Sequence, residues 1–299
     1  MANWSYQFRN LFFKLKASLK YALSRPNRNG KLAMHAMFKD EAAWLSEWLD
    51  WHFSQGVDHV FLTNDDSSDD YHSVLKPYLN AGLITLENSI DHHDFYHREQ
   101  EAKNGILKRF GKQYQWIAFL DSDEFLFFEE PIKTSLKKLP ANASGMVLNW
   151  LIYGTAHVED LKEGEYLLKK LDRRFPDGHE EHRQVKSIVV CQKGAAFFHH
   201  NPHYPNYSPW APLYWSDGQR FRPNQSRILH ELGHVKHYWY RTENYFKNQK
   251  RARRQFFDGA ARRKELEDWH AQRSNAVRDS FPTEKLNELF SWQEAFRKG

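Results

Sequence analysis

Short apolar runs alternate with longer amphipathic stretches along the first two thirds of the chain. Residues 32–38 and 116–120 are continuous apolar runs, which is typical of buried strands. Residues 41–53 form a longer stretch rich in Trp and Leu, which indicates a helix. We predict strands at 32–38, 57–63, 83–86, 116–120, 145–151 and 185–190, and helices at 41–53, 71–79 and 97–110.

This alternation predicts an α/β fold with a mostly parallel sheet and helices on both of its faces. The later part of the chain is less regular. Residues 198–223, crowded with Pro, His, Trp and Tyr, predict a long loop, and the chain from residue 243 onward indicates helices with a basic face. The resulting division is an N-terminal helix and linker (1–30), a central domain (31–240, with halves 31–130 and 131–240) and a basic helical extension (241–299).

The N-terminal segment carries one apolar stripe at helical spacing, on a helix otherwise lined by basic residues. The stripe consists of Trp4, Phe8, Leu11, Phe12, Leu15, Leu19 and Leu23. Such an amphipathic helix either packs on the protein body or lies on an anionic membrane surface. Residues 1–31 hold seven Lys and Arg and no Asp or Glu, which favours the membrane.

Charge is unevenly distributed within the formal net charge of +5. Residues 241–299 hold fourteen basic and nine acidic residues, whereas residues 32–240 hold 22 basic and 29 acidic residues, a net charge of −7. An acidic centre argues against binding to nucleic acid and fits a domain that binds a cation. The chain has a single cysteine and no apolar run of about 18 residues, and lysines interrupt the apolar positions of its N-terminal segment. These features predict a cytoplasmic protein that is bound peripherally at the inner face of the cell membrane.

Asp121 and Asp123 follow directly on the predicted strand at 116–120. Open α/β sheets bind their ligands at the carboxyl ends of strands. Two carboxylates one residue apart can both reach a divalent ion, and oxygen ligands suit Mg²⁺ or Mn²⁺, which bridges phosphate oxygens. An isolated Asp-x-Asp is usually a solvated turn, but a buried strand that ends in three acids, including Glu124, indicates a bound cation.

A second polar turn, residues 64–69, also ends a predicted strand. It is either an ordinary turn in which Asp69 caps the next helix, or a site where short polar side chains recognise a base or ribose. The acidic strand end at residue 121 favours the second interpretation.

Several motifs stand in one order along residues 31–255. They are Lys39-Asp-Glu41, Trp44-Leu-x-Glu-Trp-Leu49, Gly56-Val-Asp-His59, Asp65-x-Ser-x-Asp69, residues 116–125, Asn149-Trp150-x-x-Tyr-Gly154, Val185-Lys-Ser-Ile188, His200-Asn-Pro-His203 and His237-Tyr238. This ordered set resembles glycosyltransferases of the family 2 and family 92 type. The resemblance implies a GT-A fold, a nucleotide-sugar donor and a metal ion, Mn²⁺ or Mg²⁺, bound at the Asp-x-Asp motif.

By this resemblance Asp121 and Asp123 bind the metal. His237 matches the late His-Tyr of the family, where it completes the metal's ligands or meets the donor phosphates; the alternative is a buried histidine satisfied by the backbone. The donor-binding candidates are Asp40, Glu41, Asn64, Asp65, Asp69, Asp121 and, for its charge, Lys186. Asp40 stands where Asn is usual and Asn64 where Asp is usual, so the base stays open, and a UDP-sugar is the expected donor.

An inverting transfer needs a carboxylate that accepts the proton of the acceptor hydroxyl. Glu159 and Asp160 are the candidates, with Asp160 preferred. The aromatic segment after residue 198 is either an ordered loop over the core or one wall of the acceptor site. The acceptor candidates are Trp150, His200, His203, Tyr204 and Trp210. We expect transfer of a hexose to a glycan or lipid-linked acceptor, in bacterial surface polysaccharide or lipopolysaccharide synthesis.

Two other functions remain open. His230-Glu231-Leu-Gly-His234 has the His-Glu-x-x-His pattern of zinc peptidases, which requires a helix that carries both histidines on one face. Gly233 weakens a helix there, and the flanking residues fit an extended chain equally well. A carbohydrate-binding, membrane-associated protein without catalysis is the second alternative.

Overall fold

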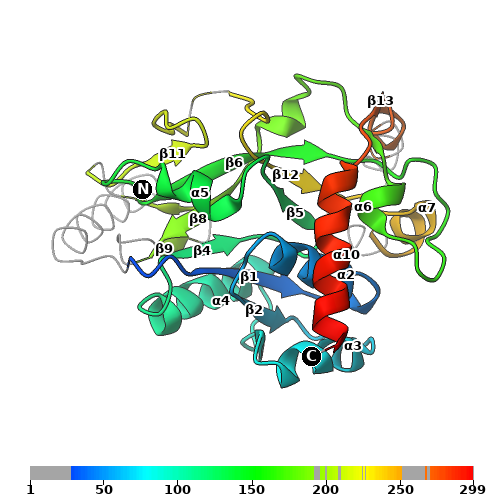
Figure 1. The fold of residues 1–299 in the computed structure, drawn as a ribbon, viewed down its shortest axis with the longest axis horizontal. Coiled ribbons are helices and arrows are strands. Elements are labelled where there is room, and N and C mark those ends of the chain that lie inside the picture. The colour runs from blue at the N-terminus through cyan, green and yellow to red at the C-terminus, as the bar shows by residue number, and fades with distance from the viewer. Residues whose placement is uncertain are drawn as a thin grey trace.

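A sheet of nine strands forms the centre of the molecule in the computed structural model (Figure 1). The strand order is β3-β2-β1-β4-β8-β6-β12-β5, and β11 also pairs with β6. The strands are β1 (Leu32–Phe38), β2 (His59–Asn64), β3 (Ile84–Asn88), β4 (Trp116–Phe119), β5 (Glu124–Phe127), β6 (Gly145–Ile152), β8 (Val185–Val190), β11 (Leu213–Trp215) and β12 (His234–His237). The structure describes residues 28–191, 196–198, 201–207, 210–223, 225, 227–250, 267 and 270–298, so the amphipathic helix expected near the N-terminus lies outside the described residues.

The strand directions confirm a mostly parallel α/β fold. β1 runs parallel to β2 and β4, β2 runs parallel to β3, and β6 runs parallel to β11 and β12. β8 is antiparallel to β4 and β6, and β5 is antiparallel to β12. The carboxyl ends of β1, β2 and β4 therefore meet at one edge of the sheet.

Helices cover both faces of the sheet. On one face, α2 (Ala42–Ser54) and α3 (Tyr71–Asn80) pack on the side chains of Leu32, Met34 and Ala36 in β1. On the other face, α4 (Phe95–Phe110) packs on Ala33. Because alternate residues of β1 contact opposite helical layers, every residue of the strand except His35 is apolar, which explains why its bounds were predictable.

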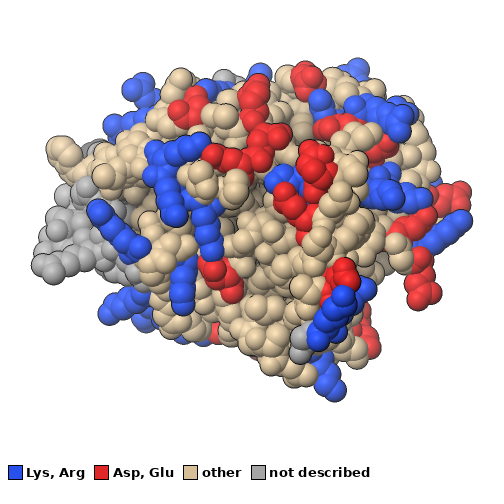
Figure 2. Space-filling model, viewed as in Figure 1, with Lys and Arg blue, Asp and Glu red and all other residues tan. Residues whose placement is uncertain are grey.

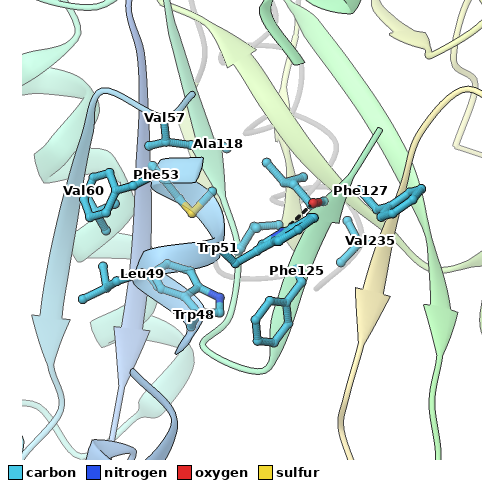
Figure 3. Close-up of a cluster of buried hydrophobic side chains, with 14 of the residues drawn as sticks. Trp48, Leu49, Trp51, Phe53, Val57, Val60, Ala118, Phe125, Phe127 and Val235 are labelled. Atoms are coloured by element: carbon cyan, nitrogen blue, oxygen red, sulfur yellow. Dashed lines mark hydrogen bonds between the residues drawn. The ribbon is translucent and has the colours of Figure 1, made fainter. Parts of the chain in front are cut away.

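Two tryptophans of α2 fix the position of β5. The indole N–H groups of Trp48 and Trp51 donate to the carbonyls of Glu124 (2.7 Å) and Leu126 (2.8 Å). The Leu126 N–H donates to His52 Nε2 (3.1 Å), and burial lowers the pKa of His52 to about 3, so its ring is neutral and can accept. Figure 3 shows Trp51 reaching from α2 toward β5 within the buried cluster.

The C-terminal helix α10 (Thr283–Lys298) lies against α2 in Figure 1. Trp292 stacks on Phe53 with ring centroids 5.4 Å apart, and Gln293 donates to Asp50 (2.7 Å) inside the contact. Shorter elements complete the described chain: α5 (Ile132–Lys137), α6 (Leu167–Lys170), β7 (Arg173–Arg174), a 3₁₀ turn (Glu180–Arg183), β9 (Ala196–Phe198), β10 (Asn201–Asn206), α7 (Glu243–Tyr245), a π-helical turn (Phe246–Lys250) and β13 (Val277–Arg278).

The prediction of a long loop at 198–223 is wrong in part. The segment contains β10, which pairs with β9 in a separate two-stranded sheet, and β11, which joins the main sheet. Pro202 and Pro205 lie in β10, where a strand of a two-stranded sheet tolerates the missing N–H groups. Because proline is rare in strands, the composition of this segment did not predict β10.

Charged side chains of both signs are interspersed over the face that Figure 2 shows. A group of basic side chains gathers there over α5, which carries Lys133 and Lys137 and is followed by Lys138. Among the described residues, no helix combines the length and the apolar character that crossing a membrane requires.

Gly154 permits a close contact between the end of β6 and residues near the C-terminus. A Cβ on Gly154 would lie 2.3 Å from Asn275 Oδ1 and 2.8 Å from the Ser274 carbonyl carbon. Asn275 accepts from the Ala156 N–H (2.8 Å) and donates to Thr155 (3.2 Å), so it is fixed from several sides.

We expect Gly154→Ala to lower the free energy of unfolding by about 1–3 kcal/mol, because the added methyl forces this contact apart. The matched control is Gly105→Ala in α4, where the new Cβ would meet an Arg109 nitrogen at 3.4 Å. That change should raise the free energy of unfolding by about 0.5–1 kcal/mol. Thermal and urea denaturation measure both; equal effects of the two variants would contradict the tight contact.

Candidate functional site

The Asp-x-Asp motif lies on a tight turn between β4 and β5. The Asp121 N–H donates to the Glu124 carboxylate (2.9 Å), and the Glu124 N–H donates to the Asp121 carbonyl (3.1 Å). Asp123 and Glu124 are buried, and Asp121 is half-exposed. The turn thus brings three carboxyl groups to the sheet edge where β1 and β2 also end.

Lys186 on β8 compensates the first of these carboxylates. Its Nζ lies 2.7 Å from Asp121 and 3.3 Å from Glu124, and its side chain is 2% exposed. Burial alone would raise the pKa of Asp121, but the Lys186 ammonium holds it at about 2. Burial raises the pKa of Glu124 well above its usual value, and Asp121 and Asp123 add to that rise even though Lys186 opposes it.

Asp123 lies between a histidine and a second lysine. His237 Nε2 is 3.3 Å from Oδ1 of Asp123, and Lys250 Nζ is 2.6 Å from Oδ2. Burial alone would raise the pKa of Asp123, but Lys250 and His237 hold it well below its usual value. Burial lowers the pKa of His237, although Asp123 opposes the shift, so the imidazole is neutral.

The donors around Asp123 fit a divalent cation. Ligand atoms of Asp123, Glu124 and His237 lie within 4.8 Å of one another. The 3.3 Å between Asp123 Oδ1 and His237 Nε2 is close to the separation of two adjacent ligands that are each about 2.1 Å from one ion. Nδ1 of His237 is buried without a hydrogen-bond partner among the described residues, and a neutral imidazole and a carboxylate are ligands that Mn²⁺ accepts.

The polar turn at residues 64–69 opens on a cavity of about 620 Å³ at the ends of β2 and β3. Arg98 of α4 donates two hydrogen bonds to the Asp65 carboxylate, from Nε (2.6 Å) and from a terminal nitrogen (2.8 Å). The Ser89 hydroxyl donates a third (2.8 Å). Burial alone would raise the pKa of Asp65, but Arg98 lowers it. Asn64 also lines the cavity and donates to Asn88 (3.1 Å).

Asp40, Glu41 and Asp69 have structural partners at the same edge. Asp40 accepts from the Ser68 N–H (2.6 Å), and Asp69 accepts from the Ala42 N–H (2.6 Å) at the start of α2. The alternative in which Asp69 caps the next helix is wrong, because Asp70 is the N-cap of α3.

Glu41 forms a buried ion pair with Arg241 and accepts from Tyr245 (2.9 Å). Arg241 also donates to the Ser122 carbonyl (3.3 Å) within the Asp-x-Asp turn. The first residues after β1 are in this way tied to the metal-site candidates.

The acceptor candidates separate into different places. The Trp150 ring lies 4.3 Å from His237 and 5.3 Å from His203, so these residues adjoin the Asp-x-Asp motif. Tyr204 packs on Phe221, with ring centroids 5.0 Å apart, whereas Trp210 is 71% exposed. His200 lies outside the described residues.

The two candidate bases lie on an exposed loop after β6. Asp160 accepts from Asn244 (2.5 Å), and the Glu159 carbonyl accepts from the Asn244 N–H (3.2 Å). Asp160 lines a cavity of about 1390 Å³, whose other walls include Asp40, Trp44 and Tyr166. The cavity is also lined by Tyr245 of α7 and by Gln249 of the π-helical turn that ends in Lys250.

The zinc-peptidase alternative is wrong, because its two histidines do not share a helix. His230 precedes β12 in an irregular segment, and His234 begins that strand. His230 Nε2 is 3.0 Å from the Trp150 carbonyl, and His234 Nδ1 is 2.9 Å from the His230 carbonyl. Gly233 has a close-packing role, because a Cβ there would lie 2.5 Å from the Phe128 ring.

Sequence reasoning missed four charged residues of this edge: Glu124 as a metal-ligand candidate, Arg98, Arg241 and Lys250. Glu124 is adjacent to the motif and was detectable as the third acid of the strand end. Arg98 and Lys250 are 33 and 127 residues from the aspartates that they contact, and no local pattern marks them.

Comparisons with known proteins identify the family of the chain. A family model for glycosyltransferase family 92 matches residues 32–273. The galactan β-1,4-galactosyltransferases GALS3 and GALS2 of Arabidopsis thaliana are 28% identical over 99 residues and 26% over 101 residues. These matches cover 31% and 32% of this chain and 19% of each relative, so the chain spans about a fifth of the length of the curated relatives it matches.

Among solved structures, that of S. aureus TarS 1-349 is similar with a TM-score of 0.38 at 12% identity, covering 89% of this chain and 73% of that one. A second TarS 1-349 structure, in complex with UDP, gives 0.35 at 15% identity, covering 54% and 47%. The glucosyl-3-phosphoglycerate synthase of Mycobacterium tuberculosis gives 0.27 at 13% identity, covering 46% and 52%.

The family model covers most of the chain, and its matched range includes both aspartates of the turn, His237 and Lys250. The chain belongs to glycosyltransferase family 92, which confirms the family resemblance that its ordered motifs indicate.

Proposed function

We propose that the protein is a metal-dependent, inverting hexosyltransferase that uses a UDP-sugar. The observation that carries this proposal is the strand end at 121–124, where three carboxyl groups lie among Lys186, Lys250 and His237. Such a charge-dense edge suits a cation together with a diphosphate, which share their charges across the site.

Asp123 and His237 would hold the divalent cation, with Asp121 beside them. When bound, the cation stabilises the negative charge that develops on the departing diphosphate. Lys186 fixes Asp121 from the other side and lies 5.9 Å from the Trp150 ring, so it also offers positive charge next to the diphosphate.

The nucleoside would bind in the cavity at the ends of β2 and β3. The amides of Asn64 and Asn88 and the hydroxyl of Ser89 line it, and such groups can pair with the donor and acceptor edge of uracil. The similar Arabidopsis proteins are named galactan β-1,4-galactosyltransferases, which favours a hexose as the transferred sugar.

The acceptor would lie in the larger cavity, with Asp160 as the base. Its carboxylate is exposed and receives one hydrogen bond from Asn244, which orients it. Trp44 and Tyr166 offer rings on which a sugar can stack. The basic N-terminal segment would hold the enzyme at the inner face of a bacterial membrane, close to a glycan or lipid-linked acceptor. Such a location fits a role in surface polysaccharide or lipopolysaccharide synthesis.

Asp123→Asn should reduce transfer by roughly 10²-fold or more, because lost ligation removes leaving-group stabilisation worth several kcal/mol. Release of UDP from a panel of UDP-sugars, measured at increasing Mn²⁺, tests this. The control is Asp177→Asn, on an exposed side chain that lines neither cavity, which should leave the rate unchanged. Near-normal transfer by Asp123→Asn would contradict the metal site, and no UDP release by the unmodified protein would favour a carbohydrate-binding protein.

Asp160→Asn should lower kcat by roughly 10²- to 10⁴-fold, because the amide cannot accept the acceptor proton, while UDP-sugar binding stays unchanged. Glu294→Gln, on an exposed side chain of α10 that does not line this cavity, is the matched control and should keep normal kcat. Steady-state transfer and calorimetric donor binding separate the two effects. An Asp160→Asn enzyme with kcat within twofold of the original would place the base elsewhere.

Deleting residues 1–28 should weaken binding to vesicles that contain anionic lipid, while UDP-sugar hydrolysis persists. Basic residues near such a surface each contribute about 1 kcal/mol, and added salt should therefore weaken binding of the full chain. Vesicle co-sedimentation at low and high salt measures this. If the full chain ignores anionic vesicles at low salt and the truncated chain melts at a lower temperature, the stripe is part of the core.

A further inference from the structure

Lys250 contacts the carboxylate that would also hold the metal ion. Its Nζ lies 2.6 Å from Asp123 Oδ2, and the two side chains are 18% and 9% exposed. The Trp239 ring lies 5.1 Å from the same ammonium. Lys250 is the last residue of the π-helical turn that follows α7, far in sequence from the Asp-x-Asp motif.

We propose that Lys250 is an exchangeable counter-cation: it neutralises Asp123 before the donor arrives and moves to the diphosphate when a divalent cation takes Asp123. The inference rests on the proposed metal and donor site. It assigns Lys250 a direct contact with the leaving group and predicts that metal and nucleotide bind cooperatively.

A buried carboxylate needs a positive partner, and two other cations that the described residues bring to this turn, Lys186 and Arg241, are already engaged. Lys186 bridges Asp121 and Glu124. Arg241 pairs with Glu41 between the rings of Trp44 and Tyr245. The ammonium in contact with Asp123 is that of Lys250.

Lys250 is also suited to release its partner. A lysine ammonium is a compact charge on a flexible stem, whereas a paired arginine is held by several directed hydrogen bonds. Lys250 is more exposed than Lys186, at 18% against 2%, so its side chain has solvent on one side into which it can turn.

The cation and the ammonium compete for the same acid. Oδ1 of Asp123 faces His237 and Oδ2 faces Lys250, so a cation between Asp123 and His237 would lie a few ångströms from the ammonium. Like charges at that range repel each other in a partly buried site. The phosphate oxygens that reach such a cation bring negative charge within reach of Lys250, and the repulsion then becomes attraction.

A cooperative site follows from this exchange. Metal binding alone must displace Lys250 from Asp123, whereas metal and diphosphate together give Lys250 a new partner. Each ligand should therefore raise the affinity of the other by the same factor. A site that holds its metal weakly without nucleotide is the expected consequence.

Lys250→Met in the full chain tests the exchange. Without nucleotide, Mn²⁺ should bind roughly tenfold more tightly than to the original protein, because the competing charge is gone. At saturating Mn²⁺, UDP should bind roughly tenfold more weakly, because one charge-assisted contact is lost. The free Mn²⁺ signal in electron paramagnetic resonance gives the first affinity, and titration calorimetry gives the second.

Two further variants control for charge and for folding. Lys247→Met removes an exposed lysine of the same turn, which pairs with Glu243 at 3.2 Å, and should change neither affinity. Lys250→Arg keeps the charge and should retain weak Mn²⁺ binding without nucleotide. If Lys250→Met does not fold, Lys250→Gln, which also removes the charge but keeps a polar side chain, should show the same two shifts.

Mn²⁺ binding by Lys250→Met that equals or falls below that of the original protein would overturn the exchange while leaving the metal site in place. Equal Mn²⁺ affinity of the original protein with and without UDP would do the same. If the original protein binds no Mn²⁺ even with UDP, the proposed metal site is wrong, and the role of Lys250 falls with it.

Discussion

The hydrogen bonds from Trp48 and Trp51 to the backbone of β5 determine where the functional edge lies. They attach α2, which follows β1, to the strand that follows the Asp-x-Asp turn. β5 in turn pairs with β12, which sets His237 opposite Glu124, and the Tyr238 N–H donates to the Asp123 carbonyl (2.8 Å). One helix thereby positions both the acidic turn and the histidine that meets it, although they are more than a hundred residues apart in sequence.

Charge compensation is the second constraint. Three carboxyl groups in one turn repel one another when ionised, so the turn needs cations nearby. The fold brings three of them from distant parts of the chain: Lys186, Arg241 and Lys250. The result is visible in the pKa values: those of Asp121 and Asp123 are lowered by their lysines, whereas that of Glu124 is raised by burial. The edge therefore keeps two carboxylates with lowered pKa values beside a third carboxyl group whose pKa is raised by burial.

The sequence predicted the features that depend on neighbouring residues. β1 and β8 have the predicted bounds because every residue of a strand covered on both faces is apolar or buried. The position of Asp121 and Asp123 at the edge of the sheet was predictable because they directly follow such a strand. The role of Asp69 was harder to predict. Its carboxylate accepts from the N–H of Ala42 at the start of α2, 27 residues earlier, and the composition of the turn does not indicate that partner. Likewise, the ring contacts that bring Trp150 to His203 and His237 arise only from the sheet order.

The C-terminal part of the chain is integral to the functional edge rather than an addition to it. Arg241, Tyr245 and Lys250 all contact acids that lie on the other side of residue 240, and Asn275 packs on Gly154 at the end of β6. Its basic composition made this region resemble a separate extension, because the sequence shows which residues are charged but not which acids they contact in the fold. In the folded chain Arg241 and Lys250 pair with Glu41 and Asp123 of the acidic centre, and the family match, which extends to residue 273, includes both. At this site, part of the charge difference between the centre and the C-terminal region is thus compensated by contacts between residues that are far apart in sequence.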